Sequence, residues 1–517
     1  MAAVIDLINQ DFGTIAALVR FHARNQPHSF ALKDNNDSLT YAQLDERMDK
    51  VAACLQRDGV VAGDVIALCA DNSVSYALIF LGALRAGVAV APLAPSASAQ
   101  SLHKMVADAQ AKIIFADANN SAFTRDFSAN AGTLVVGLSH DALNDWLASS
   151  TSDIMPCEVQ AATPFNIIYS SGTTGEPKGI VQGHGMRWAH IKRSIHYNYC
   201  ADSVTLLSTP LYSNTTLVVF FPTLAFGGCV VLMPKFNALQ YLALAQTHHV
   251  THTMLVPVQY QRLMAVPTFD EFNLNSFVMK FCTSAPFSAN LKADILRRWP
   301  GGLTEFYGMT EGGGTLILEA HNHPDKLHTV GKPALGSDIR LISDDGFELS
   351  AQDQLIGGEI IGHSAGMMTG YHGQPEKTRE VEWFDQTGKR FIRTGDVGRF
   401  DPDGFLILFD RKKDVIISGG FNIYPSDIEA VLREHPCVSD VAVVGIESAQ
   451  WGETPAAFVV LMANAQTTVA VLMNWANQRL GKTQRLASIT AVDELPRSAI
   501  GKVLKRELRA RLKHALP

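Results

Sequence analysis

The sequence lacks paired cysteines, a basic N-terminal leader and an excess of positive charge. Its seven cysteines include no Cys-x-x-Cys pair and their number is odd, so we expect reduced, mostly buried thiols in a cytoplasmic protein. The first residues include Asp6 and Asp11 and no basic start, so we expect no signal peptide. A formal net charge of −7 argues against nucleic acid as the main partner.

Long uninterrupted hydrophobic runs are also missing. The run nearest to membrane-span length, 217–233, is broken by Pro222 and by the pair Gly227-Gly228. We therefore expect a buried helix followed by a core strand there, and no membrane span. Hydrophobic residues make up 47% of the chain and charged residues 18%, which is typical of a folded protein. A length of 517 residues predicts at least two domains.

Short apolar runs alternate with helical patterns along most of the chain. The runs at 64–69 and 112–115, with helix-like stretches at 44–58 and 75–86, are examples. This alternation predicts mainly parallel α/β sheets. Near Asp410 a charged cluster begins, followed by a capped helix and further strands. We predict a large N-terminal α/β domain, 1–410, and a small α+β C-terminal domain, 411–517.

The segment Tyr169–Gly179 has the composition of a phosphate-binding loop. It follows an apolar strand, its glycines allow backbone N–H groups to converge on an anion, and Lys178 adds a positive charge. Gly481-Lys482-Thr483 resembles the end of a Walker A loop, but it lacks the upstream glycine that this motif needs. The hydroxyls able to donate to phosphate oxygens are those of Ser170, Ser171, Thr173 and Thr174.

This segment resembles the signature of the acyl-adenylate-forming (AMP-binding) superfamily, which includes acyl-CoA synthetases, luciferases and peptide-synthetase adenylation domains. Further similar segments follow in that family's order over nearly the whole chain. They are 39–44, 81–87, Ser284-Ala-Pro-Phe287, Tyr307-Gly-Met-Thr-Glu311, Arg393-Thr-Gly-Asp396, Asp410-Arg411, 418–423 and 496–502. The resemblance to the CoA-ligase branch implies a ligase that uses ATP, Mg²⁺ and coenzyme A. Its N-terminal domain, 1–410, would bind ATP and the acid, and its mobile C-terminal domain, 411–517, would carry the catalytic lysine. Such an enzyme forms an acyl-AMP with release of pyrophosphate, and then an acyl-CoA thioester with release of AMP.

The resemblance also assigns catalytic roles to single residues. It puts Thr310 at the α-phosphate and Glu311 on Mg²⁺, a hard cation that prefers carboxylates. Asp396 would bind the ribose hydroxyls, with Arg411 on the opposite side of the ribose. Lys502 would stabilise the transferring carboxylate and α-phosphate during adenylation.

Other segments would bind the adenine and coenzyme A. Lys413 falls where the family has the hinge of a mobile C-terminal domain, and the glycines Gly419 and Gly420 would face the pantetheine. The basic residues after Lys502 are expected to form a solvated helix face; they are Lys505, Arg506, Arg509 and Arg511. The predicted adenine-side residues are Ser284, Ala285, Pro286, Glu305, Phe306 and Tyr307.

The acid pocket is expected between segments 212–218 and 309–316. The candidate lining residues are Tyr212, Ser213, Asn214, Thr215, Cys282, Met309 and Gly312 to Gly314. None of them is charged, so we expect a small or medium aromatic or aliphatic acid with an uncharged tail. The glycine run would leave open space for the tail. Arg187 and Lys192 are expected to face solvent; the alternative is that one of them turns inward and pairs with a distal carboxylate of the acid.

Two departures from related patterns bear on the substrate. Ser213 stands where many acyl-CoA synthetases carry histidine and amino-acid-activating domains carry aspartate, and Met309 stands where those domains carry proline. Both favour a CoA ligase. Two alternatives remain: a stand-alone adenylating enzyme that loads an acyl carrier protein, and a nucleotide-binding module without catalysis. The sequence leaves the identity of the acid and a homodimer open.

Overall fold

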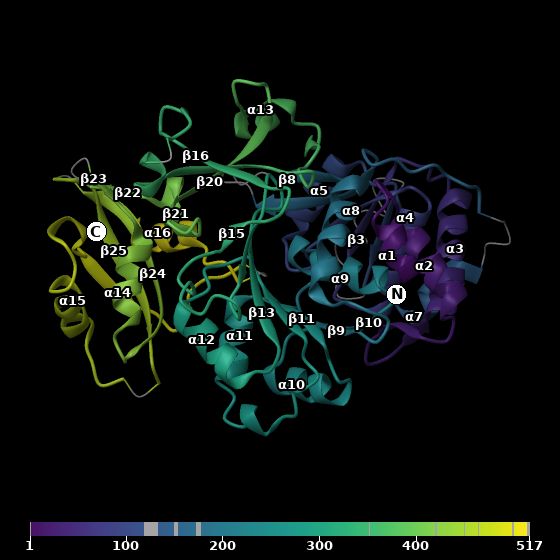
Figure 1. Cartoon of the computed structure of the whole chain (residues 1–517), viewed down its shortest axis with the longest axis horizontal. Coiled ribbons are helices and arrows are strands. Elements are labelled where there is room, and N and C mark those ends of the chain that lie inside the picture. Colours follow the sequence, from purple (N-terminus) through teal and green to yellow (C-terminus); the bar gives the residue numbers. More distant parts are fainter. Residues whose placement is uncertain are drawn as a thin grey trace. The chain divides into compact units, whose positions relative to one another are not determined.

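The computed structural model describes residues 2–117, 133–148, 154–171, 177–350, 352–418, 421–448, 450–463, 465–498 and 501–513. The chain divides into two compact units (Figure 1). The first unit comprises Met1–Asp338 and Gly362–Ile392, and the second comprises Ile339–Ile361 and Arg393–Pro517. The second unit thus includes residues upstream of 410, and a functional boundary at residue 410 stays a prediction.

The first unit contains a nine-stranded sheet whose central strands are parallel, as the sequence predicts. Only the pairings at its two edges are antiparallel. In spatial order its strands are β15 (Lys332–Pro333), β14 (Leu316–Glu319), β13 (Gly302–Tyr307), β12 (Met279–Cys282), β11 (His252–Leu255), β9 (Val204–Leu207), β10 (Cys229–Leu232), β1 (Phe30–Lys33) and β2 (Ser38–Thr40).

A seven-stranded sheet carries the predicted phosphate loop. Every residue of β3 and β4 is buried, which is typical of parallel strands covered on both faces. The strands β7 and β8 form an antiparallel hairpin with the loop at its tip. In spatial order the strands are β18 (Gly370–Tyr371), β8 (Pro177–Gly183), β7 (Pro164–Ser171), β4 (Ala89–Leu93), β3 (Val65–Cys69), β5 (Ile113–Ala116) and β6 (Leu134–Gly137).

Two further sheets each have five strands. The third sheet has the order β16 (Asp338–Ile342), β17 (Gly358–His363), β20 (Arg390–Phe400) and β19 (Glu382–Phe384), with β21 (Leu406–Arg411) paired to β20. The fourth has the order β23 (Phe421–Ile423), β22 (Ile416–Ser418), β25 (Gly452–Leu461) and β24 (Val438–Ser448), with β26 (Ser488–Ala491) paired to β25. Side chains such as Ile428, Val443 and Leu472 form the core over this fourth sheet.

Several helices begin at a residue whose side chain caps the N-terminus. A capping box of Thr40 and Gln43 starts the helix expected at 44–58, and the helix expected at 75–86 is buried along nearly its whole length. The α-helices are α1 (Ala2–Ile8), α2 (Ile15–Asn25), α3 (Tyr41–Arg57), α4 (Val74–Arg85), α5 (Ala99–Ala109), α7 (His140–Ala148), α8 (His184–Arg193), α9 (Asn214–Ala225), α10 (Ala238–Thr247), α11 (Pro257–Met264), α12 (Ala289–Arg298), α13 (Pro375–Val381), α14 (Pro425–Arg433), α15 (Val469–Asn477) and α16 (Lys505–Lys513).

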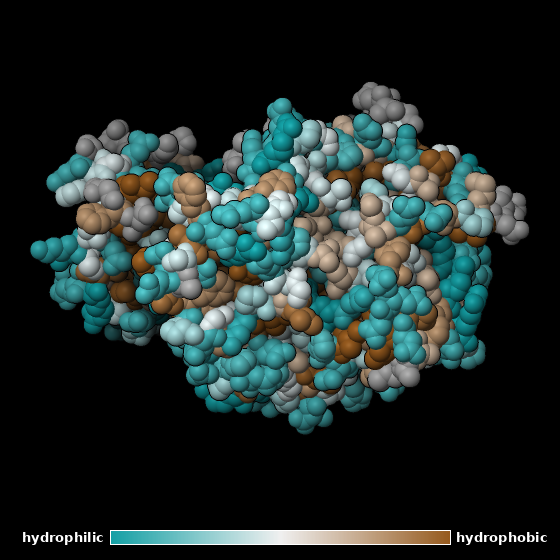
Figure 2. Space-filling model, turned by 45° about the horizontal axis from the view of Figure 1, so that its top comes forward, coloured by the Kyte–Doolittle hydropathy of each residue, from teal (hydrophilic) through white to brown (hydrophobic). Residues whose placement is uncertain are grey.

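The hydrophobic run 217–233 forms the buried helix α9 and the core strand β10, as expected. Across the described residues, every helix is too short or too polar to cross a membrane. The face displayed in Figure 2 mixes hydrophilic residues with scattered hydrophobic ones. The seven cysteines are free thiols, and Cys54, Cys69 and Cys282 are buried.

Candidate active site

Tyr371 connects the phosphate-loop hairpin to the predicted magnesium ligand. Lys178, on β8, has its Nζ 5.2 Å from the ring centre of Tyr371. The hydroxyl of Tyr371 donates to Oε1 of Glu311 at 2.9 Å, just beyond the end of β13. Burial, and next the nearby Glu311, raises the pKa of Tyr371, so this hydroxyl stays protonated and donates. Two predicted motifs, far apart in sequence, therefore meet through a residue that the sequence analysis missed.

The side-chain hydroxyls of the predicted phosphate loop lie outside what the structure describes. Thr173 and Thr174 lie outside the described residues, and only the backbone of Ser170 and Ser171 is described. The roles predicted for these four residues stay predictions.

Glu311 has the character of a magnesium ligand. Mg²⁺ is usually held by one or two carboxylates together with substrate phosphates, rather than by a cage of protein ligands. Among the described residues no group of three or more His, Cys, Asp or Glu side chains forms such a cage. The carboxylate of Glu311, whose role as a magnesium ligand stays a prediction, would hold such an ion together with phosphate oxygens.

The glycine run after Glu311 is packed against backbone. A Cβ on Gly312 would lie 1.9 Å from the carbonyl oxygen of Gly366, and one on Gly313 would lie 2.9 Å from Cβ of Ile392. Both glycines have positive φ angles, 78° and 86°. The expectation of open space at these two glycines is therefore wrong: they are needed for a left-handed backbone and for close approach of neighbouring segments.

The change Gly312→Ala is expected to destabilise the protein by at least about 2 kcal/mol, because it combines a left-handed backbone penalty with a backbone clash. The matched control is Gly59→Ala. Gly59 has a φ of 82° but no atom within 4 Å of its added Cβ, so only the backbone penalty of about 1 kcal/mol is expected. Urea unfolding midpoints measure both, and equal midpoints would contradict the packing argument.

The residues predicted to line the acid pocket have mixed roles. The Ser213 hydroxyl accepts from the backbone N–H of Thr215 and so caps the N-terminus of α9. The hydroxyl of Thr215 lies 2.5 Å from that of Ser284, whose φ is 83°. The structure thus joins the predicted acid segment to the predicted adenine-side loop. Met309 packs against the cluster that contains Tyr371.

Arg187 is not a surface residue. It is only 2% exposed, and its guanidinium donates to the side-chain oxygens of Asn166, Gln182 and Asn214. Burial lowers the pKa of Arg187 to about 9. The expectation that Arg187 faces solvent is therefore wrong. Lys192, by contrast, reaches the carbonyls of Asn9 and Gln10 near the surface.

The predicted adenine-side residues lie on β13 and in the loop between β12 and α12. Glu305 is 4% exposed and forms an ion pair with Lys292 of α12, while its burial raises the pKa of its carboxyl group. Phe306 stacks on Phe281 at 5.4 Å. The adenine contacts expected of these residues stay predictions. They concern Glu305, Phe306 and Tyr307 on the strand, and Ala285 and the exposed Pro286 in the loop.

In the second unit, Asp396 and Arg411 form an ion pair with Nε 3.0 Å from Oδ1. They are register partners on β20 and β21, so the strand pairing itself brings them together. Arg393 in the same motif is held by Glu359 of β17 at 2.6 Å. This framework fixes the carboxylate predicted to accept hydrogen bonds from a ribose diol.

Lys502 lies exposed at the end of a tight turn. The backbone N–H of Ser498 donates to the carbonyl of Lys502 at 2.8 Å, and Arg497 donates to the carbonyl of Gly501 and to Asp440 of β24. Gly501 has a φ of 78°, which favours glycine. The turn is thus attached to the C-terminal sheet while the lysine side chain extends from it.

The expectation of a solvated helix face is wrong for Lys505 and Arg509 of α16, whereas Arg506 and Arg511 on the same helix are exposed. Lys505 pairs with Glu429 of α14 at 3.1 Å and lies 3.9 Å from Asp410. Arg509 pairs with Asp414 at 2.8 Å. Within the second unit these contacts attach α16 to the segment around Lys413.

Lys413 lies in the short 3-10 helix Lys412–Asp414. Its neighbour Lys412 pairs with Asp344 at 2.9 Å and with Glu359 at 3.3 Å. Gly419 and Gly420 lie outside the described residues. The hinge role of Lys413 and the pantetheine contacts of the two glycines stay predictions.

Comparison with known proteins decides the family. The model of the AMP-binding enzyme matches residues 19–372, and the model of the AMP-binding enzyme C-terminal domain matches residues 427–502. This chain belongs to the AMP-binding enzyme family. The predicted resemblance to the acyl-adenylate-forming superfamily is confirmed, and so is the predicted fold class.

Relatives of this AMP-binding enzyme match along its full length. It is 31% identical to a feruloyl-CoA synthase from an Amycolatopsis species, over 95% of this chain and 97% of the relative. It is 30% identical to an indoleacetate–CoA ligase from Aromatoleum aromaticum, over 94% and 96%. The crystal structure of ATP-bound MatB from Rhodopseudomonas palustris matches with a TM-score of 0.87, 28% identity and coverage of 97% and 99%.

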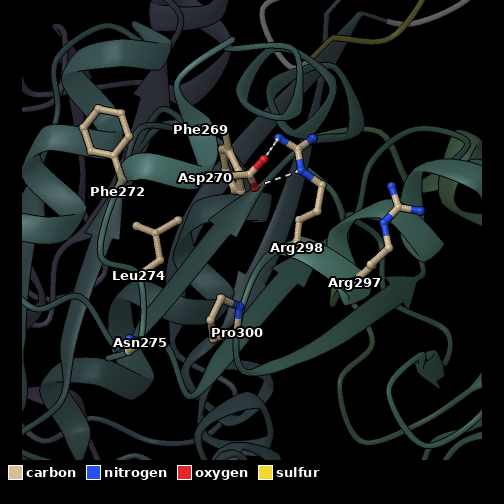
Figure 3. A pocket seen from close by; sticks show the side chains of 8 residues that line it. All are labelled: Phe269, Asp270, Phe272, Leu274, Asn275, Arg297, Arg298 and Pro300. Carbon is tan, nitrogen blue, oxygen red and sulfur yellow. Dashed lines mark hydrogen bonds and ion pairs between the residues drawn. The ribbon is translucent and has the colours of Figure 1, made fainter.

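A hollow elsewhere on this AMP-binding enzyme contains none of the predicted site residues. Its polar groups pair with one another, since Arg298 binds Asp270 through two contacts of 3.0 Å (Figure 3). The lining residues are Phe269, Asp270, Phe272, Leu274, Asn275, Arg297, Arg298 and Pro300. The candidate active site therefore remains the set of predicted motifs and not this hollow.

Proposed function

We propose that this AMP-binding enzyme is an acid–CoA ligase that acts on a small or medium aromatic or aliphatic carboxylic acid. The observation that carries the proposal is full-length similarity to relatives named as CoA synthases and ligases. The presence of Glu311, Asp396 and Lys502 supports a catalytic protein over a nucleotide-binding module.

In the first half-reaction the acid carboxylate attacks the α-phosphorus of ATP and pyrophosphate leaves. Lys502 would stabilise the anionic charge that develops there, and Mg²⁺ held by Glu311 would neutralise phosphate charge. In the second half-reaction the coenzyme A sulfur attacks the acyl carbonyl, a thioester forms and AMP leaves. Asp396 would hold the ribose throughout.

The test is a panel of acids assayed for pyrophosphate release with ATP and Mg²⁺. The panel contains ferulate, indoleacetate and a fatty acid series, because relatives carry these acids in their names. Free coenzyme A and a carrier protein are then compared as acceptors. Release of AMP with coenzyme A is expected; release only with the carrier protein would favour the carrier-loading alternative, and no release with any acid would refute the proposal.

The change Lys413→Pro is expected to slow thioester formation relative to adenylation by about tenfold, the effect of roughly 1.4 kcal/mol in a barrier. Proline fixes φ and disfavours the helical conformation of Lys412 before it, so rotation about the predicted hinge is restricted. Lys413→Ala keeps that freedom and serves as the control. An unchanged ratio of the two half-reaction rates in the proline variant would remove Lys413 as the hinge.

A further inference from the structure

Three side-chain amides surround the buried guanidinium of Arg187. Its Nε and Nη2 donate to Oδ1 of Asn166 at 3.2 and 2.9 Å, and its Nη1 donates to Oδ1 of Asn214 at 2.7 Å. Nη2 also donates to Oε1 of Gln182. The three amides come from β7, β8 and the first residue of α9. One arginine on α8 therefore connects three elements of the first unit.

Arginine determines which way these amides point. A guanidinium has only donors, so each amide must turn its oxygen toward Arg187 and its NH₂ group away. The NH₂ group of Asn166 donates to Gln182 at 2.9 Å, and that of Gln182 donates to the carbonyl of Thr310 at 2.6 Å. The donor-only guanidinium of Arg187 thus determines which amide atom is oxygen and which is nitrogen in this network.

The NH₂ group of Asn214 is different from the other two. Among the described residues it has no hydrogen-bond partner, and Asn214 is partly exposed whereas Arg187 behind it is buried. A free amide donor beside a buried positive charge favours an oxygen acceptor and disfavours an ammonium group.

The same helix has a second arginine without a carboxylate partner among the described residues. Arg193 donates to the hydroxyl of Thr315 at 3.0 Å and lies 5.6 Å from the ring centre of Phe306. Arg187 and Arg193 therefore contact the two segments, 212–218 and 309–316, that are predicted to flank the acid. Within the part of the chain that the structure describes, each segment is thus contacted by an arginine that has no carboxylate partner.

We propose that Arg187 holds Asn214 as a hydrogen-bond donor to the tail of the bound acid, and that the preferred acids carry an acceptor oxygen on that tail. The inference rests on the proposed function, because it takes Asn214 as part of the acid pocket. Arg187 acts as a positioning residue, and Asn214 determines specificity. A carbonyl, ether or carboxylate oxygen would bind there; a protonated amine would be rejected.

The experiment compares two acids that differ only in a tail ketone and the matching methylene group, C=O against C=CH₂. Both are built on the scaffold that the acid panel selects. The wild-type enzyme is expected to prefer the ketone by about tenfold in kcat/KM, the effect of one hydrogen bond to a neutral group. Asn214→Leu should bring the ratio to about one. Asn214→Asp should bring it below one, since a carboxylate paired with Arg187 offers no donor.

Two further variants separate positioning from folding. Arg187→Met releases Asn214 and should also reduce the ratio, whereas Lys192→Met, on the same helix but outside the network, should keep it. A general loss of stability would lower the rates of both acids together and leave their ratio unchanged.

The outcomes are distinct. A wild-type ratio near one, or a ratio that Asn214→Leu does not change, overturns this inference while the ligase activity stands. If Arg187→Met does not fold, the two Asn214 variants still decide the donor role. Failure of every acid to release pyrophosphate overturns the proposed function itself.

Discussion

Replacement of Lys502 by alanine is expected to reduce acyl-adenylate formation by about 10²- to 10³-fold, the usual effect of removing one electrostatic contact from a transition state. Thioester formation from a supplied acyl-adenylate should change by no more than about threefold, because the lysine would act in only one half-reaction. The exposed side chain extends from a turn that backbone hydrogen bonds hold, so its loss should leave the fold intact. Pyrophosphate release and thioester formation measure the two steps separately.

Lys482→Ala is the matched control for this variant. Lys482 is also exposed in the second unit, and it belongs to the Gly-Lys-Thr segment that resembles the end of a Walker A loop. Wild-type rates are expected. If the Lys482 variant lost adenylation, or if the Lys502 variant lost both half-reactions equally with its fold intact, the assignment of Lys502 would be wrong.

Glu311→Gln should lower the rate of adenylation by about 10²-fold and raise the Mg²⁺ concentration needed for half-maximal rate, because an amide is a poor ligand for a hard cation. The neutral side chain can still accept from Tyr371, so the local packing should survive. Titration of the initial rate with Mg²⁺ measures both effects.

Glu319→Gln makes the same chemical change on β14 and should leave the Mg²⁺ dependence unchanged. A Glu311→Gln enzyme with an unaltered Mg²⁺ requirement would show that the ion is held elsewhere. Tyr371→Phe removes only the hydrogen bond to Glu311 and is expected to give a smaller loss, about tenfold or less.

The sequence predicts the parallel sheets and the strand before the phosphate loop because burial on both faces leaves a local pattern of apolar residues. The end of β13 at Tyr307 is likewise local, since a glycine follows it. These elements can therefore be predicted from the local sequence alone.

The partners of charged residues could not be predicted in this way. From the sequence Arg187 is expected to face solvent on a helix, but the amides that its guanidinium binds lie on three other elements. Lys505 and Arg509 read as a basic surface, yet the acids that pair with them lie 76 to 95 positions earlier in the chain. Only the tertiary structure brings such pairs together.

The close packing of the glycine run and the capping role of Ser213 could not be predicted from the sequence either. The glycine run suggested room for a substrate, whereas backbone from 362–366 fills that room at Gly312 and Gly313. Ser213 caps α9, and nothing in its immediate sequence distinguishes a cap from a substrate contact. Tyr371 lies 60 residues from Glu311, and no spacing rule connects the two.

The free cysteines have a consequence for an enzyme that would use a thiol as a substrate. Burial raises the pKa of Cys69 to about 12 and that of Cys229 to about 11, and it raises the pKa of Cys282 as well. Exchange with a disulfide requires a thiolate, and at neutral pH these three groups remain thiols. A disulfide such as oxidised coenzyme A is therefore expected to leave these three positions unmodified.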